Sequence, residues 1–399
     1  DSEWQRVAHA FAQLSGMRGM RLTTPSSALE RTKPPSVKRV RLETAACPVP
    51  VKKQRKYNLT RWAVTGRDDI AINAACQRIY SAIANAKPKD PVWKELCHLW
   101  ASDFRTHITE TRWKEYCIKL DAMEHRLSVG PTSAPTPTEG TAITDRYISV
   151  ATDALSARLD RRRGLAVKWH AFGNDPSCIG GLPHGHFDDI ALQADWYTGD
   201  CVLEQPGEPK ITDLEWAETE IARDALGNTV VQGRIATPLG PIDKRLCFHN
   251  EAPRLDFDLT FNWNTWPKGS LRLGHVTLLP DAFDARHLML MTHNGGLDPE
   301  RFALYGETIE HGAPVSFLVS ASCGLGLTEG WAELSDGSRG VRVEVDRETA
   351  PLLGLLTHRE VKGRLFCQLM LSMLELDDTS RPTPYRVGPR RVRFCVLKA

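Results

Sequence analysis

The segment Asp160-Arg161-Arg162-Arg163-Gly164-Leu165 marks the place where the pattern of apolar residues changes. Before it, apolar residues recur at the three- and four-residue spacing of amphipathic helices. After it, short alternating or β-rich runs such as Leu255–Phe261 and Val392–Leu397 are separated by Gly, Pro, Asn and Asp. Three arginines followed by a glycine suit a helix end, because cations interact favourably with the C-terminal dipole and glycine caps it. The sequence therefore predicts helices up to this point and antiparallel β-structure beyond it.

Helical spacing upstream of this segment predicts helices at about 68–86, 91–107, 109–123 and 144–161. The short connections between them are typical of an antiparallel bundle. Residues 128–142 are rich in Pro, Thr and Gly and predict a flexible loop.

The first thirty residues predict a helix, a short strand over Met17–Leu22 and a new helix start at Thr24-Pro25. This order indicates the last step of an α/β barrel. Residues 31–66 are basic and Pro-rich, and we interpret them as a solvated connector, with a nucleic-acid patch as the alternative.

Together these patterns predict an α+β fold class with an N-terminal α/β barrel remnant, an antiparallel helical bundle and a large antiparallel β-sandwich. The expected domains are 1–30 for the remnant, 31–66 for the connector, 67–162 for the bundle and 163–399 for the sandwich.

Composition limits the classes of function. The chain has 399 residues, 41% hydrophobic and 25% charged, with a formal net charge of +2. These values are ordinary for a globular protein, and the charge argues against a nucleic-acid partner. No apolar run is long enough for a membrane span and no secretory signal is visible, so no membrane partner is expected. Because the chain opens on Asp1 rather than Met, we expect a processed protein or a piece of a longer one.

The ten cysteines show no CxxC spacing, which argues against a zinc ribbon or a thioredoxin-like site. Free thiols in a reducing cytoplasm are expected, with disulfides in a periplasm as the alternative. A cytoplasmic location follows as the prediction.

The stretch Trp93–Ile108 carries the candidate binding residues. On a regular helix Leu96, Trp100, Asp103 and His107 fall in one apolar stripe, where an Asp and a His are costly to desolvate unless paired or used. The alternatives are a functional site that uses the two groups and a satisfied structural pair.

The densest polar cluster is Pro183-His-Gly-His-Phe-Asp-Asp189. His-x-His on a strand places both imidazoles on one face, a usable metal geometry, but no third ligand is specified. A turn with local hydrogen bonds is the expected alternative. The sequence predicts no metal, no cofactor and no catalytic residue.

Several segments in order resemble the region after the catalytic barrel in glycoside hydrolase family 57 and the related family 38 enzymes. They are Arg21–Leu29 as the barrel's end, Leu99–His107 in the helical domain, and Arg163–Val167, Leu182–Ile190 and Asp195–Gly199 at the entry to the sandwich.

This resemblance implies the C-terminal, non-barrel part of an α-acting glycoside hydrolase or glucanotransferase in carbohydrate metabolism. Its partners would be an oligo- or polysaccharide and a catalytic barrel upstream of Asp1 that holds the catalytic carboxylates, which this chain alone lacks. The substrate-binding residues implied are Trp100, Asp103, Phe104, Arg105 and His107, with His184, His186, Asp188 and Asp189 as a secondary set.

Two other functions stay open. A carbohydrate-binding module would expose aromatic residues on the sandwich, among Trp196, Tyr197, Trp263 and Trp266. A structural interaction protein without catalysis would show neither such aromatics nor a sugar cleft.

Overall fold

The computed structural model describes residues 3–31, 63–86, 88–104, 108–133, 139–294, 297–306, 324–325, 327–376 and 384–399. The chain divides into two compact units, Asp1–Glu43 and Thr44–Ala399. The prediction of a basic connector falls largely on residues outside the described ones, as does part of the predicted loop at 128–142.

The described part of the first unit contains the helices α1 (Glu3–Gly16) and α2 (Pro25–Arg31). No residue of α1 is buried, and Trp4 and Phe11 are 80% and 54% exposed. Met17–Leu22, expected as a strand, form a turn and irregular backbone. The predicted barrel remnant is therefore wrong, because a barrel step needs a strand that covers the apolar face of its helix.

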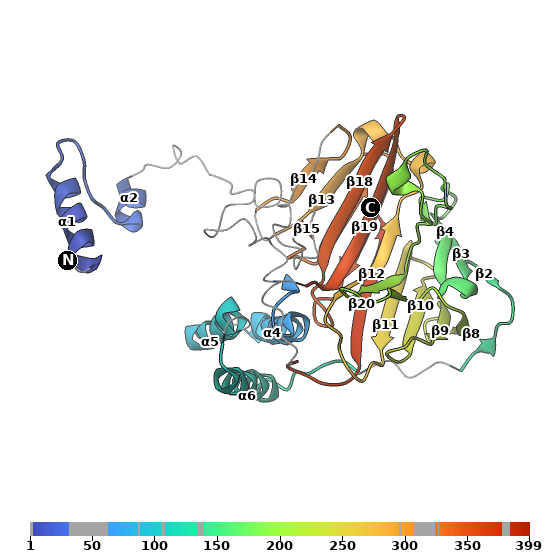
Figure 1. Cartoon of the computed structure of the whole chain (residues 1–399), viewed down its shortest axis with the longest axis horizontal. Helices are drawn as coiled ribbons and strands as arrows, with labels where there is room; N and C mark the ends of the chain where they lie inside the picture. Colours follow the sequence, from blue (N-terminus) through green and yellow to red (C-terminus); the bar gives the residue numbers. More distant parts are fainter. Residues whose placement is uncertain are drawn as a thin grey trace. The chain divides into compact units, whose positions relative to one another are not determined.

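Three helices open the second unit: α4 (Asp69–Ala86), α5 (Asp90–Trp100) and α6 (Glu110–Arg126), with a 3₁₀ turn, η1 (Ser102–Phe104), between the last two. They pack around a small core of their own, in which Ile79, Leu99 and Leu120 are almost fully buried. Thr109 caps α6 by accepting a hydrogen bond from Arg112 N. Figure 1 shows the three helices at one end of the β-structure.

The prediction of a fourth helix at 144–161 is wrong. The strands β2 (Tyr147–Ala151) and β3 (Leu155–Asp160) form an antiparallel hairpin there. Burial follows a period of two, with Ile148, Val150 and Leu155 inside, and Thr152 Oγ1 accepts a hydrogen bond from Leu155 N in the turn. The apolar spacing was thus that of a strand, and β-branched residues favour it.

The β-region consists of antiparallel pairs in three sheets. The ten-stranded sheet has the order β1-β8-β9-β10-β11-β20-β17-β16-β13-β14. Its strands are β1 (Thr141–Ala142), β8 (Ala217–Arg223), β9 (Thr229–Ile235), β10 (Ile242–Phe248), β11 (Arg254–Phe261), β13 (Met289–Thr292), β14 (Glu300–Ala303), β16 (Trp331–Ser335), β17 (Gly340–Val345) and β20 (Arg390–Lys398).

The six-stranded sheet has the order β15-β18-β19-β12-β6-β7, and the four-stranded sheet the order β2-β3-β4-β5. Their remaining strands are β4 (Ala166–Phe172), β5 (Ile179–Gly180), β6 (Cys201–Glu204), β7 (Ile211–Thr212), β12 (Ser270–Thr277), β15 (Gly324–Leu325), β18 (Leu353–Val361) and β19 (Arg364–Leu374). The other 3₁₀ turns are η2 (Arg161–Arg163), η3 (Ile190–Leu192), η4 (Pro280–Ala282) and η5 (Ala285–His287).

One apolar core lies between the two larger sheets. It joins residues of β10, β11 and β20 to residues of β12 and β19, for example Phe257 and Phe394 with Leu273 and Leu371. The sheets approach closely at Gly274, where an added Cβ would lie 2.4 Å from the ring of Phe394. The expectation of a β-sandwich is thus confirmed.

The turn that opened the sequence analysis does not end a helix. It joins β3 to β4, with Asp160 capping η2 and Gly164 at φ +60°. A Cβ at Gly164 would lie 1.8 Å from the carbonyl oxygen of Asp213, so only glycine fits this left-handed position.

The predicted fold class, with a barrel remnant and a helical bundle before the sandwich, is therefore wrong. The described residues hold five α-helices and are otherwise mostly antiparallel β-structure. The boundary predicted between residues 162 and 163 stays a proposal. Among the described helices, none combines the length and the apolar character that crossing a membrane requires.

Candidate functional site

The side of the ten-stranded sheet that points away from the apolar core is unusually rich in charge. Alternation along each strand, together with the strand register, puts charged and polar side chains from five neighbouring strands on this side. We call this surface the polar face. It consists of Glu218, Glu220, Gln232, Arg234, Asp243, Arg245, Asp258, Thr260, Arg391 and Arg393.

Oppositely charged groups alternate across the polar face. Arg234 Nε lies 2.9 Å from Asp243 Oδ1, and Asn262 Nδ2 donates to Asp243 Oδ2 at 2.8 Å. Arg391 holds Asp258 through two parallel bonds, of which Nε to Oδ1 is 2.8 Å. A hollow of about 470 Å³ lies over β8 to β11 on this side. The polar face therefore offers donors and acceptors side by side.

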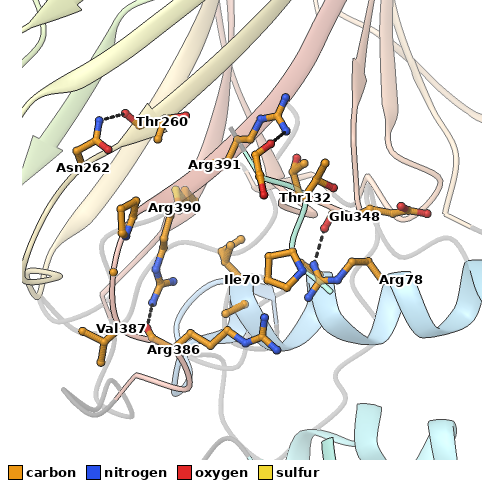
Figure 2. A pocket seen from close by; sticks show the side chains of 18 residues that line it. Ile70, Arg78, Thr132, Thr260, Asn262, Glu348, Arg386, Val387, Arg390 and Arg391 are labelled. Carbon is orange, nitrogen blue, oxygen red and sulfur yellow. Dashed lines mark hydrogen bonds between the residues drawn. The ribbon is translucent and has the colours of Figure 1, made fainter. Parts of the chain in front are cut away.

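A second cavity, of about 460 Å³, lies next to the polar face. Thr260 and Arg391, which belong to the polar face, also line this cavity. We call it the arginine pocket. Figure 2 shows Arg78 coming from α4 and Arg390 and Arg391 from β20. Its full lining is Ile70, Ala71, Ala74, Arg78, Pro131, Thr132, Ser133, Thr260, Asn262, Glu348, Thr349, Met373, Arg386, Val387, Gly388, Pro389, Arg390 and Arg391.

The four arginines of this pocket are each paired with a carboxylate. Arg78 and Arg386 bind Glu124, Arg390 binds Asp68, and Arg391 binds Asp258. Three of them also donate to backbone carbonyls: Arg78 Nη1 to Glu348 O at 2.7 Å, Arg391 Nη1 to Ser133 O at 2.5 Å and Arg390 Nη2 to Arg386 O at 3.5 Å. The guanidinium groups are thus fixed in place and largely neutralised.

Trp100 and Phe104, two of the residues predicted in the Trp93–Ile108 stretch, pack against the small helical core. The Trp100 indole N–H donates to Asn73 Oδ1 at 3.0 Å, and Phe104 stacks on Tyr116 with ring centroids 5.0 Å apart. Both contacts bind the helices together.

Asp103 does not share the buried stripe with Leu96, contrary to the expectation. The α-helix ends at Trp100, and Asp103 lies exposed in η1. Because the backbone of Ala101 is extended, with ψ 142°, the helix is interrupted there and the predicted 3.6-residue spacing does not continue to Asp103. Arg105 and His107 lie outside the described residues, so the Asp103–His107 pair is untested.

The predicted secondary set lies in a surface turn rather than on a strand face. His184 is exposed, and His186 Nε2 lies 3.0 Å from Arg364 Nη2, an arrangement in which burial and this cation lower the pKa of His186. Asp188 and Asp189 pair with Lys362 and Arg359. The structure thus gives His186 a partner in Arg364 and leaves the His184 side chain exposed, and a role of this set in sugar binding stays a prediction.

The aromatic residues suggested for a binding module are not freely exposed. Trp263 is 1% exposed, and Trp196 and Tyr197 are half-buried, with the Trp196 ring packed on Phe366. Trp266 packs against Trp263 and under the guanidinium of Arg390. These side chains mainly stabilise the sandwich.

The sequence analysis missed the polar face and the arginine pocket. A signal was present, because charges alternate with apolar residues within the predicted strands, as in Arg391-Val-Arg393 and Asp256-Phe-Asp258. Which strands lie side by side was not evident, and the pocket also requires α4 and the segment at 386–391.

Comparisons with solved structures give distant matches. A putative aldose 1-epimerase from Escherichia coli is 10% identical with a TM-score of 0.38, covering 63% of this chain and 98% of that one. A 4-α-glucanotransferase from Thermococcus litoralis is 11% identical with a TM-score of 0.35, covering 83% and 50%. An α-mannosidase from Enterococcus faecalis is 10% identical with a TM-score of 0.39, covering 66% and 30%.

The solved structures that resemble this chain thus include carbohydrate-active enzymes. At these identities and TM-scores the likeness says nothing about the activity of this chain. No family model matches the chain, and no curated protein matches its sequence. Families 57 and 38 are therefore not shown for it.

Proposed function

We propose that the polar face and the arginine pocket bind a neutral saccharide. The observation that carries the proposal is the set of guanidinium–carboxylate pairs that present donors and acceptors together, as in Arg391 with Asp258 and Arg234 with Asp243. A sugar hydroxyl both donates and accepts hydrogen bonds, so a surface of this kind matches it. Thr132, Thr260 and Asn262 add further partners at the pocket wall.

The pairing of charges favours a neutral ligand over an anion. Anion sites present unneutralised arginines, whereas each arginine of this pocket is paired with a carboxylate, and Arg78 and Arg386 share Glu124. Arg386 also lies 3.5 Å from Asp121. A phosphate here would meet four carboxylates close to the four cations.

A finer proposal comes from the resemblance given above. The chain would be the C-terminal, non-barrel part of an α-acting glycoside hydrolase or glucanotransferase, with Trp100, Asp103 and Phe104 as a second candidate sugar site. In that case the purified 399-residue chain would bind an α-glucan without hydrolysing it.

The test is titration calorimetry of the purified chain with neutral α- and β-linked oligosaccharides and with inorganic phosphate. We expect binding of at least one neutral oligosaccharide, and Arg391→Lys should weaken it about tenfold or more, because lysine cannot hold Asp258 in two parallel bonds. The matched control is Arg126→Lys, which alters an exposed Arg–Glu pair on α5 and α6. The absence of binding across the neutral panel, or tighter binding of phosphate, would contradict the proposal.

A further inference from the structure

Three side chains of different chemistry meet at the end of the β10–β11 hairpin. The Cys247 thiol, a His249 ring nitrogen and an Asp256 carboxylate oxygen all lie within 4.8 Å of one another. Cys247 and Asp256 are direct partners across the antiparallel pair, and His249 follows two residues after Cys247 on the same side. This set plays no part in the pairs of the polar face described above.

From this arrangement we propose that Cys247, His249 and Asp256 form a binding site for a borderline divalent metal such as Zn²⁺. Sulfur, imidazole nitrogen and carboxylate oxygen are the ligand types that Zn²⁺ takes in proteins. Three protein ligands leave one tetrahedral position for a water molecule or a fourth donor.

The spacing of the ligand atoms of His249 and Asp256 fits such an ion after a small adjustment. His249 Nε2 lies 2.9 Å from Asp256 Oδ2. Two donors at about 2.0–2.1 Å from one tetrahedral Zn²⁺ lie roughly 3.3 Å apart. Binding therefore requires these atoms to separate by a few tenths of an ångström, which side-chain rotation supplies because both groups are about one-quarter exposed.

The surroundings of the carboxylate support the assignment. Arg254 Nε donates to Asp256 Oδ1 at 2.6 Å, which leaves Oδ2 on the side of His249. Metal ligands usually have an outer partner that fixes their orientation in this way. A thiolate and a carboxylate together balance the charge of a divalent ion.

A fourth group lies close to the sulfur. Cys247 Sγ lies 3.7 Å from Asp224 Oδ2, and Asp224 is itself fixed by Asn228, whose Nδ2 donates to the same oxygen at 3.0 Å. In the metal-free protein this carboxylate accepts the thiol proton in a hydrogen bond. On metal binding the thiol releases its proton to solvent and the sulfur becomes a ligand.

The sequence did not reveal this site, because Cys-x-His on a strand end carries only two ligands. The third ligand, Asp256, lies beside Cys247 because of the register between β10 and β11. Part of the site is open to solvent, since His249 is 26% and Asp256 27% exposed, so an ion can enter without unfolding.

The experiment uses Co²⁺ as a spectroscopic substitute for Zn²⁺ on the full chain. We expect one equivalent to give a tetrahedral visible spectrum with a sulfur-to-cobalt charge-transfer band, displaced by Zn²⁺. Cys247→Ala should abolish the charge-transfer band, and His249→Ala should weaken binding by more than the roughly 10–100-fold that outer-shell changes cost.

The matched control is Cys178→Ala, which removes another buried free thiol, just before β5, that is not among the three proposed ligands. It should leave the spectrum unchanged. Circular dichroism of each variant tests folding separately. A wild-type spectrum of octahedral hydrated Co²⁺ would overturn the proposal, as would a charge-transfer band that survives in folded Cys247→Ala or disappears in folded Cys178→Ala.

Discussion

Lys244 Nζ lies 2.6 Å from Asp213 Oδ2, and their side chains are only 2% and 0% exposed. Lys244 belongs to β10 in the ten-stranded sheet, whereas Asp213 follows β7 in the six-stranded sheet. The same ammonium donates to the carbonyl oxygens of Gly164 and Gly199 at 2.9 and 2.7 Å. A buried cation thus joins both large sheets to the turn after β3, which explains why a charge persists inside the sandwich.

Lys244→Met is expected to destabilise the fold by about 3–5 kcal/mol, because it leaves the buried carboxylate of Asp213 uncompensated. Urea unfolding measures the loss. In the double variant with Asp213→Asn, part of the stability should return, since the amide oxygen still accepts from Cys201 N. The control is Lys210→Met in an exposed pair with Glu204; equal losses for Lys210→Met and Lys244→Met would contradict the role of burial.

His170 makes the fold sensitive to acid. Its side chain is fully buried in β4, and burial lowers its pKa to about 4. The unfolded chain has a histidine pKa of about 6.5, so between these values the unfolded state binds more protons and stability falls as the pH falls. The resulting loss of unfolding free energy is about 3 kcal/mol at pH 4 and is absent above about pH 7.

His170→Leu should therefore flatten the decline in unfolding free energy between pH 7 and pH 4, measured by denaturant unfolding at several pH values. Some slope will persist, because burial also lowers the pKa of His186 and His358. His9→Leu changes an exposed histidine of α1 and should keep the wild-type slope. An unchanged slope in His170→Leu would show that the decline has another origin.

Glu124 holds the helices to the C-terminal segment. Its carboxylate is buried and binds Arg78 at 2.6 Å, and it also accepts from Arg386 and from the Tyr385 hydroxyl. Glu124→Gln should cost about 3 kcal/mol or more, because the buried guanidinium of Arg78 then loses its counter-charge and Arg386 keeps only Asp121. Thermal unfolding measures this, with Glu95→Gln in an exposed pair as the control; a loss no larger than that of the control would refute the anchoring role.

How far the sequence predicted the structure depended on the range of the interactions. The alternation in Leu255–Phe261 and Val392–Leu397 correctly indicated strands, because burial on one side of a sheet imposes a period of two. At 144–161 the same rule applied, but the apolar residues at 148, 155 and 159 also fit a helical spacing. The turn at Thr152 distinguishes a β-hairpin from a helix, and the geometry of this turn could not be predicted from the sequence.

The candidate site was less predictable, because it depends on contacts between distant segments. Arg391 meets Asp258 only through the pairing of β20 with β11, and Arg78 reaches Glu348 across 270 residues. The prediction that Asp103 lies in a buried helical stripe was wrong for a local reason, because the helix ends at Trp100.

The last prediction decides between the two candidate sugar sites. Asp103 is exposed in η1 and lines neither the hollow over the polar face nor the arginine pocket. Asp103→Asn should leave the unfolding free energy within about 0.5 kcal/mol of wild type, as for most surface substitutions. If the saccharide lies on the polar face, its dissociation constant should also stay unchanged in Asp103→Asn, while Arg391→Lys weakens binding about tenfold or more. Titration calorimetry on the three proteins measures this. The opposite pattern, weaker binding in a stably folded Asp103→Asn and none in Arg391→Lys, would place the ligand on the helices and refute the polar-face proposal.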